Sequence, residues 1–266
     1  MEPFRVHILG CGSALPTLRH FPSSQVIEVR GKLFLVDCGE GTQIQLRRSR
    51  LRFTKIGAVF ISHLHGDHCF GLIGMLSTFG LLGRTAKLTI YAPVELSTLM
   101  RMQIDAFCRD LEYEVEFKEV DTTQNQIIYE DRSLTVEAIP LEHRVKCCGY
   151  LFREKPTRNN PDLIRAYAYC SDTRYMPGLH ELVKGVNTLY HESTYGEDNR
   201  LKAEKYYHST ARDAAMVARD AGVGQLLLGH YSSRYEDEGV LLQEAKEVFP
   251  NSLLTDEGIV VEVGGE

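Results

Sequence analysis

Short apolar runs alternate with amphipathic segments along the whole chain, and the two patterns predict different elements. Apolar runs of about four to eight residues between turn residues are typical of buried strands, whereas apolar residues spaced three and four apart are typical of helices. The first part of the chain is predicted to hold a helix from Thr42 and strands at Arg5–Leu9, Gln25–Val29, Lys32–Val36, Ala58–Ile61, Leu88–Tyr91, Tyr113–Phe117, Ile127–Tyr129 and Leu134–Ile139. The second half is predicted to hold strands at Tyr167–Cys170, Thr188–His191, Gln225–Leu228 and Ile259–Val263, and helices near Thr210–Ala221 and Gly239–Val248.

This alternation predicts an α/β protein in which two sheets pack face to face with helices outside, a four-layer αββα sandwich. The chain of 266 residues is long enough to bury a full core, and no linker rich in proline, serine or glycine divides it. We therefore expect a single domain over residues 1–266.

Cysteine usage and hydropathy indicate a soluble protein from a reducing compartment. The seven cysteines are an odd number and form no Cys-x-x-Cys pair, which argues against a disulfide framework and against a thiolate zinc ribbon. The most apolar stretch, Cys69 to Gly83, has only 15 residues and contains four glycines, and the N-terminus lacks the apolar core of a signal peptide. We expect a cytoplasmic protein that does not bind membranes.

Net charge does not favour a nucleic-acid partner, because the formal charge is -6 and most such partners are bound by basic surfaces. Five basic residues nevertheless crowd one short window: Arg47, Arg48, Arg50, Arg52 and Lys55. Two interpretations stay open at this point, a solvated helix face and a basic patch beside a cationic site.

The strongest chemical signal follows the apolar run Ala58–Ile61, where four side chains that bind metals occupy six positions. They are His63, His65, Asp67 and His68, with Gly66 between the two pairs. Imidazole suits zinc, and a carboxylate beside it adds an oxygen ligand that zinc or manganese accepts. A histidine-rich turn without an ion is the alternative, but clustered polar groups at a strand end need partners. The pattern therefore predicts a metal site.

Three later residues stand where predicted strands end, and they can complete a centre with two ions. His143, Asp172 and His230 would each, taken alone, be read as a hydrogen-bonded loop residue. Taken with the first loop, they predict two ligand sets: His63, His65 and His143 for one ion, Asp67, His68 and His230 for the other, and Asp172 as the bridge. A hydroxide shared by both ions would fit between them.

With these residues the chain resembles the ribonuclease Z family of the metallo-β-lactamase superfamily. The resemblance covers nearly the whole chain and rests, besides the ligand loop, on Leu9–Pro16, Val36–Gln43, Glu142–His143, Ser171–Thr173, His191–Thr194, His208–Thr210 and Gly229–Tyr235. It implies the metallo-β-lactamase αββα fold, two Zn²⁺ ions per subunit with manganese as the alternative, and a homodimer. It also implies an endonuclease that removes the 3′ trailer from precursor tRNA and leaves a 3′-hydroxyl on the tRNA.

The requirements of phosphodiester hydrolysis suggest roles for Asp67 and for two further side chains. Two divalent ions can activate a shared water and neutralise the phosphate oxygens, so no side-chain nucleophile is needed. Asp67 is the candidate acceptor of the water proton, and His208 is the candidate donor to the leaving oxygen, with Glu192 raising its pKa. The alternative for His208 is a surface or helix-capping residue, since Ser209 or Thr210 is a normal N-cap for the next helix.

Substrate contacts are expected from two loops. By family resemblance, Arg19 and Ser24 lie near the RNA end, together with His20. Arg234 and Tyr235 follow His230 closely enough to reach a phosphate or stack on a base, although structural hydrogen bonding explains both equally well.

One departure from the family concerns the arm that grips the tRNA elbow, which is missing or reduced around residues 155–166. Either this sequence lacks a segment of the natural protein, or the enzyme binds its substrate differently. Two other functions therefore stay open. One is a small-molecule phosphodiesterase or arylsulfatase on the same scaffold, and the other is a metal-binding protein without catalysis.

Overall fold

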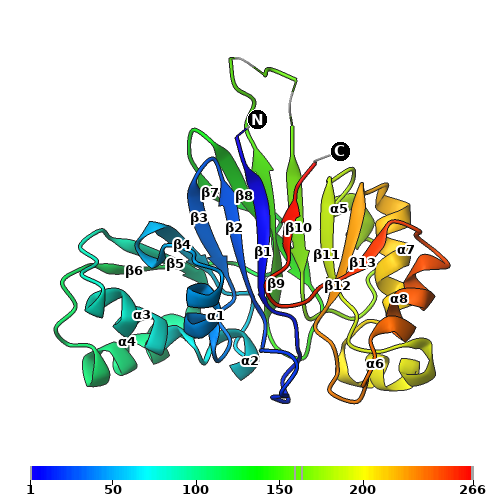
Figure 1. Ribbon diagram of the computed structural model, residues 1–266, viewed down its shortest axis with the longest axis horizontal. Helices are drawn as coiled ribbons and strands as arrows, with labels where there is room; N and C mark the ends of the chain where they lie inside the picture. Colours follow the sequence, from blue (N-terminus) through cyan, green and yellow to red (C-terminus); the bar gives the residue numbers. More distant parts are fainter. Residues whose placement is uncertain (1, 159, 163, 265–266) are drawn as a thin grey trace. The chain divides into compact units, whose positions relative to one another are not determined.

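The computed structural model describes residues 2–158, 160–162 and 164–264, and it divides into two compact units. Unit 1 comprises Met1–Asp121 and Asp256–Val261, and unit 2 comprises Thr122–Thr255 and Glu262–Glu266. Each unit is built on one mixed sheet with its own helices (Figure 1). The α/β class with two sheets, as predicted from the sequence, is therefore confirmed. The prediction of a single domain stays a prediction.

The sheet of unit 1 has the strand order β14-β1-β2-β3-β4-β5-β6 among the described residues. Strands β1, β2 and β3 pair antiparallel, and β3 to β6 run parallel. The strands are β1 (Phe4–Gly10), β2 (Ser24–Val29), β3 (Lys32–Val36), β4 (Ile56–Phe60), β5 (Leu88–Ala92), β6 (Val115–Glu119) and β14 (Val260–Glu262), and the helices are α1 (Thr42–Arg48), α2 (Gly66–Cys69), α3 (Leu72–Leu81) and α4 (Val94–Phe107), with a short 3₁₀ turn at Phe53–Lys55.

Three of these helices cover one face of the sheet and form its core. Leu46 of α1, Phe79 of α3 and Leu96 of α4 pack with strand residues such as Leu35 and Val59. Strand β3 is buried on both faces after its first residue, which explains its unbroken apolar run. The carboxyl ends of β3 and β4 lie side by side because the two strands are parallel neighbours.

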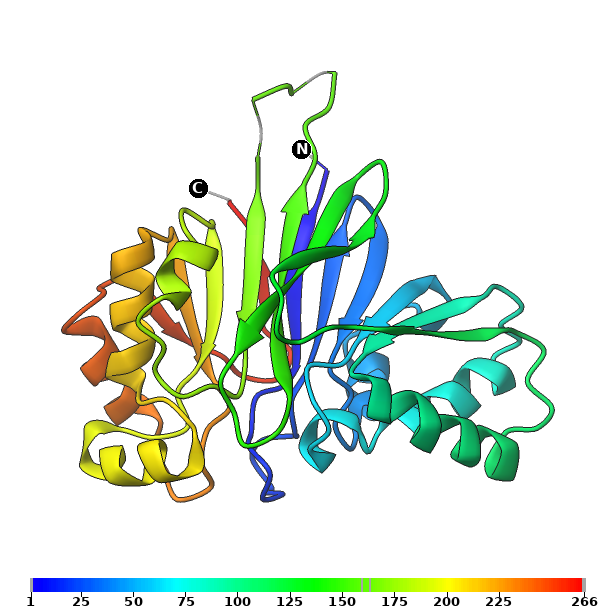
Figure 2. The same ribbon diagram turned by 180° about the vertical axis from the view of Figure 1, so that it is seen from behind.

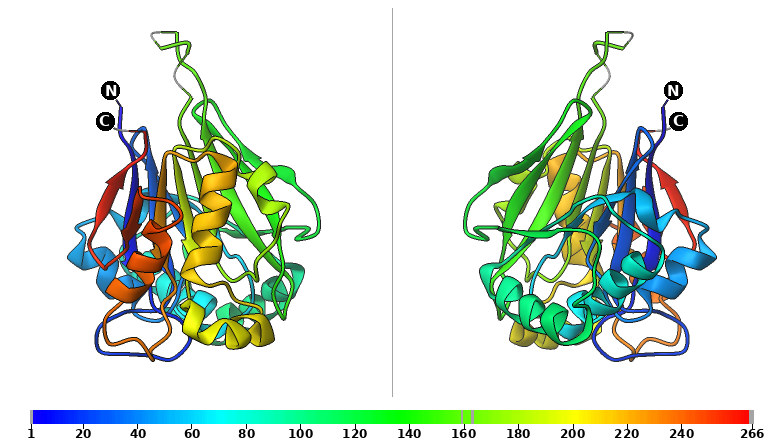
Figure 3. Two further views of the ribbon diagram at one scale, coloured as in Figure 1. Left: turned by 90° about the vertical axis from the view of Figure 1, so that its right-hand side faces the viewer. Right: turned by 90° about the vertical axis from the view of Figure 1, so that its left-hand side faces the viewer.

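The sheet of unit 2 has the order β13-β12-β11-β10-β9-β8-β7. Strands β7 to β10 pair antiparallel, and β10 to β13 run parallel. The strands are β7 (Gln126–Glu130), β8 (Leu134–Leu141), β9 (Cys147–Glu154), β10 (Ala166–Cys170), β11 (Thr188–Glu192), β12 (Gln225–Gly229) and β13 (Ser252–Leu254), and the helices are α5 (Leu179–Leu182), α6 (Arg200–Tyr206), α7 (Ala211–Ala221) and α8 (Gly239–Lys246), with a 3₁₀ turn at Glu197–Asn199. Helices α7 and α8 pack against the parallel part of this sheet (Figure 3).

The connection between β9 and β10 is short, at the position where the family arm was predicted to be missing or reduced. It runs from Lys155 to Arg165 (Figure 2), and within it Asn159 and Leu163 lie outside the described residues. Its base is fixed by a buried ion pair, in which Arg165 Nε donates to Glu154 Oε2 at 2.7 Å and Nη2 donates to Oε1 at 3.1 Å. The described part of this connection contains one isolated bridge, Thr157 with Asn160, and no helix.

One prediction about the placement of the strands was wrong. The strand predicted at Ile259–Val263 for the second half is β14, which pairs with β1 in unit 1, because the chain turns back at Gly258 and the Ile8 amide donates to the Ile259 carbonyl at 3.0 Å. The strand predicted before the ligand loop over Ala58–Ile61 is present as β4, which ends one residue earlier, at Phe60. Among the described helices, none is long and apolar enough to cross a membrane.

Candidate metal centre

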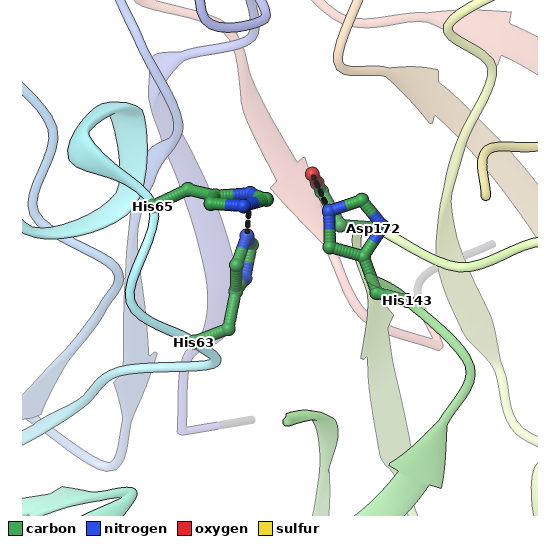
Figure 4. A group of neighbouring side chains, drawn as sticks. All are labelled: His63, His65, His143 and Asp172. Carbon is green, nitrogen blue, oxygen red and sulfur yellow. Dashed lines mark hydrogen bonds and ion pairs between the residues drawn. The ribbon is translucent and has the colours of Figure 1, made fainter. Parts of the chain in front are cut away.

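The ligand loop of unit 1 presents its four side chains as two neighbouring pairs. His63 follows β4, His65 is the N-cap residue of the short helix α2, and Asp67 and His68 lie within that helix. His63 Nε2 lies 3.0 Å from His65 Nδ1 (Figure 4), and His68 Nε2 lies 3.4 Å from Asp67 Oδ2. Such separations are close to the distance of about 3.3 Å between two nitrogen or oxygen ligands of one tetrahedral ion.

Asp37 fixes the orientation of this loop from the end of β3. Its fully buried carboxylate accepts hydrogen bonds from the Ser62 amide at 2.8 Å, the Ser62 hydroxyl at 2.9 Å and His68 Nδ1 at 2.7 Å. The Ser62 hydroxyl also lies 3.0 Å from His63 Nδ1. Histidines that bind metals are usually held at their second ring nitrogen in this way, so the contacts assign Nε2 of His63 and His68 to an ion.

Glycine is required where the turn after β3 touches the ligand loop. A Cβ atom at Gly39 would lie 2.5 Å from the carbonyl oxygen of Asp67, and one at Gly71 would lie 2.1 Å from the carbonyl oxygen of Gly39. The Cys38 amide also donates to the His68 carbonyl at 2.8 Å. The Asp37–Gly41 turn thus sets the position of the ligand loop as well as connecting β3 to α1.

In unit 2, Asp172 lies between two histidines and offers a different oxygen to each. Its Oδ2 lies 3.6 Å from His143 Nε2 (Figure 4), and its Oδ1 lies 3.1 Å from His230 Nε2. The other nitrogens are held as in unit 1, with His143 Nδ1 donating to the Tyr207 carbonyl at 2.9 Å and His230 Nδ1 lying 2.8 Å from Thr194 Oγ1. This is the arrangement that a carboxylate bridging two ions requires.

Three residues at the strand ends adopt left-handed backbone conformations. They are Asp37 with φ 55°, Asp172 with φ 60° and His230 with φ 60°. Such conformations are unfavourable for residues other than glycine, and they persist at functional sites where the surroundings impose them. The backbone strain therefore lies at three residues of the candidate centre.

Glu192 and His208 form a buried acid–imidazole pair beside Asp172. His208 Nδ1 lies 2.8 Å from Glu192 Oε1, and Glu192 is fully buried. Burial alone would lower the pKa of His208, but the Glu192 carboxylate and its hydrogen bond raise that pKa to about 9. The N-cap of α7 is Thr210, which forms a capping box with Asp213, so His208 is not the capping residue.

Each unit presents donor groups of the kind that divalent metals bind. They combine neutral imidazole nitrogens with carboxylate oxygens, the ligand types that zinc binds in tetrahedral or five-coordinate sites. Burial lowers the pKa of His143, which keeps this imidazole neutral and able to donate its lone pair to an ion. Sequence reasoning missed two of the supporting groups, the Thr194 hydroxyl and the Tyr207 carbonyl.

The expected substrate residues fall into two kinds. Arg19 and Arg234 are exposed, and the Arg234 guanidinium lies 5.8 Å from the centre of the Tyr195 ring. Ser24 and Tyr235 are buried and hydrogen-bonded within the protein, Ser24 to the Asp37 carbonyl at 3.2 Å and the Tyr235 hydroxyl to the Gly196 amide at 2.8 Å. Substrate contact by all four stays a prediction.

Part of the basic window packs on aromatic rings in unit 1. Arg47 and Arg48 lie in the last turn of α1, and their guanidinium groups each lie 5.7 Å from a ring centre, that of Phe53 and that of Phe21 respectively. Arg50 and Arg52 line the neighbouring surface hollow with Arg47. The structure thus leaves both interpretations of the basic window in place.

Comparison with known proteins gives consistent results over nearly the whole chain. The model of a family described as the β-lactamase superfamily domain matches residues 32–231. A ribonuclease Z of Bacteroides fragilis (strain YCH46) is 48% identical over 302 residues, covering 98% of this chain and 99% of that protein. A ribonuclease Z of Porphyromonas gingivalis (strain ATCC BAA-308 / W83) is 42% identical, covering 99% of this chain and 100% of that protein.

Among solved structures, the crystal structure of the short form of human tRNase Z superposes with a TM-score of 0.81 at 28% identity, covering 98% of this chain and 100% of that one. The metallo-β-lactamase fold protein YhfI from Bacillus subtilis gives a TM-score of 0.79 at 23% identity, covering 98% of this chain and 100% of that one. These matches confirm the predicted metallo-β-lactamase fold and the resemblance found in the sequence. The 302-residue alignment with the Bacteroides protein exceeds the 266 residues of this chain, so the relative contains residues without a counterpart here.

Proposed function

The chain belongs to the ribonuclease Z family of the β-lactamase superfamily, whose members are metal-dependent endoribonucleases, and we propose that it removes the 3′ trailer from precursor tRNA with two Zn²⁺ ions. Manganese is the alternative metal. Family membership and the donor set of both units support this proposal.

The observation that carries the two-ion proposal is the position of Asp172 between His143 and His230. A carboxylate with one oxygen beside each of two imidazoles is suited to bridge two ions. The pairs in the ligand loop supply the remaining ligands, His63 and His65 for one ion and Asp67 and His68 for the other. When bound, the ions would activate water and neutralise charge on the phosphate oxygens.

The protein groups then have two proton tasks. Asp67 would hold one of the ions, and its carboxylate would accept the proton of the attacking water. His208 donates a proton to the leaving ribose 3′-oxygen, and Glu192 keeps that imidazole protonated and oriented. The 3′-hydroxyl stays on the tRNA and the phosphate stays on the trailer.

Two further properties complete the proposal. We propose a homodimer, as the family resemblance implies, and a cytoplasmic location. The location is supported by the seven cysteines, which lie in the described residues and are all free thiols, because such thiols persist in a reducing compartment.

A second candidate function is a small-molecule phosphodiesterase on the same scaffold. The short connection between β9 and β10 favours it, because a grip on the tRNA elbow contributes affinity through phosphate contacts. A metal-binding protein without catalysis is disfavoured by the buried Glu192–His208 pair, which has the geometry of a proton donor.

The test is single-turnover cleavage of a precursor tRNA with a 3′ extension, with both product ends mapped and bis(p-nitrophenyl) phosphate hydrolysed in parallel. A single cut next to the discriminator nucleotide supports the tRNA function. Hydrolysis of the small diester without RNA cleavage would replace it with the small-molecule function. Failure of both reactions in the zinc-loaded protein would refute catalysis.

A further inference from the structure

Four side chains able to bind a metal meet in unit 1, on residues that the catalytic proposal does not use. Cys11 directly follows β1, His20 lies in the loop before β2, and Asp256 and Glu257 lie in the turn before β14. One ligand atom from each of the four lies within 4.8 Å of all the others.

Three of the contacts converge on one nitrogen. His20 Nδ1 lies 3.3 Å from Cys11 Sγ, 3.0 Å from Glu257 Oε2 and 3.8 Å from Asp256 Oδ1. The Cys11 thiol also donates to Glu257 Oε1 at 3.8 Å, so thiol, imidazole and carboxylate contact one another in one cluster. Tetrahedral zinc holds its nitrogen, oxygen and sulfur ligands about 3.3 to 3.6 Å apart, which is close to the separations around His20 Nδ1.

The same contacts exclude a nucleophilic triad. In a thiol–imidazole–carboxylate triad the thiol and the acid use opposite ring nitrogens. Here Cys11 and Glu257 both lie beside Nδ1 of His20, and Cys11 is fully buried, so no substrate reaches its sulfur. The cluster therefore has the arrangement of a structural ion site.

Backbone hydrogen bonds hold Glu257 in place, and one carboxylate of the cluster is exposed to solvent. Glu257 Oε1 accepts hydrogen bonds from the Phe21 amide at 2.7 Å and the Cys11 amide at 3.4 Å, which directs Oε2 toward His20. The side chains of His20 and Glu257 are 12% and 11% exposed, whereas that of Asp256 is 67% exposed and provides an entry side for an ion.

We propose that unit 1 binds a structural Zn²⁺ ion through Cys11, His20, Asp256 and Glu257. Residues 11–23 form neither helix nor strand apart from an isolated bridge between Gly12 and Pro22, so the ion would tie this loop to the turn before β14. The loop carries Arg19, for which we predict an RNA contact. Binding releases the Cys11 thiol proton to solvent, so the affinity rises with pH.

Cobalt titration of the whole protein tests the site without depending on catalysis. A thiolate bound to Co²⁺ gives a near-ultraviolet sulfur-to-metal charge-transfer band. The proposed catalytic ligands contain no cysteine, so the band reports the new site alone. We expect it in the parent protein and expect Cys11→Ser to abolish it, while the matched control Cys69→Ser, next to the catalytic ligand loop, keeps it.

A second variant covers the case in which Cys11→Ser does not fold. Glu257→Gln keeps an oxygen that accepts the hydrogen bond of the Phe21 amide but removes the negative charge, so the variant should stay folded. It should lose one bound zinc ion per chain. Elemental analysis after dialysis measures this loss. Absence of the charge-transfer band in the parent protein, or its survival in folded Cys11→Ser, would overturn the site. Cleavage assays on the same samples separate this result from a failure of the proposed function.

Discussion

Replacement of Asp37 by asparagine tests how the protein orients its ligating histidines. Asparagine has nearly the same shape and tolerates the left-handed conformation of this residue, at φ 55°, so the backbone gains no strain. Its amide oxygen can still accept the bond from the Ser62 amide. Its NH₂ group, however, would face His68 Nδ1 and force that nitrogen to accept, which places the proton on Nε2, the nitrogen assigned to the ion.

The magnitude follows from the bond that is lost. A hydrogen bond to a charged group contributes about 1.5 to 3 kcal/mol. Since about 1.4 kcal/mol corresponds to a factor of ten in an equilibrium constant, zinc affinity in Asp37→Asn should fall by about 10- to 100-fold, the range found for other groups that hold metal-binding histidines. The cleavage rate at subsaturating zinc should fall in parallel.

The assay is competition for zinc between the protein and a chromophoric chelator, with thermal unfolding measured on the same samples. Glu40→Gln is the matched control, because Glu40 is an exposed carboxylate in the same turn. Asp37→Asn binding zinc as tightly as the parent protein would refute the orienting role of Asp37.

Four other variants have distinct expected outcomes. His65→Ala should lose metal from the centre and all cleavage activity, as read by elemental analysis and single-turnover rates. His208→Ala should keep both ions yet cleave slower by a factor of about 10² or more, as for a lost general acid; full activity would reject that role. Gly39→Ala should lower metal occupancy, because its Cβ would collide with the Asp67 carbonyl. Thr210→Ala removes the α7 cap and should lower the free energy of unfolding by about 1 kcal/mol in a denaturant titration, with cleavage at saturating metal unchanged.

Elements with local signals were predictable from the sequence. Strand β3 has the predicted bounds because its apolar run is enclosed by Gly31 and Asp37. Helix α7 begins after Thr210, one of the two residues predicted as its cap. Strand β9 was not predicted, since its polar end reads as a loop. Its Glu154 is buried only because Arg165 pairs with it. The sequence of β9 itself does not indicate that Arg165 is the partner.

The candidate centre likewise contains residues that could be predicted from the sequence and groups that could not. The ligand loop is visible in the sequence because its four side chains lie within six positions, and Asp172 and His230 could be found at strand ends. The groups that hold the histidines could not all be found, because they lie far away in sequence. Thr194 is 36 positions from His230, and the Tyr207 group that binds His143 is a backbone carbonyl, which any residue offers.

The most direct test of the central claim is the single-turnover cleavage rate of a precursor tRNA with a 3′ extension, measured as zinc is restored stepwise to the metal-free Cys11→Ser protein. Because this variant lacks the Cys11 ligand of the proposed structural site, we expect the added zinc to enter the catalytic centre. We predict no cleavage without metal, and a single cut next to the discriminator nucleotide that reaches its full rate only with the second equivalent of zinc. Full cleavage without metal or at one equivalent would contradict a two-ion centre.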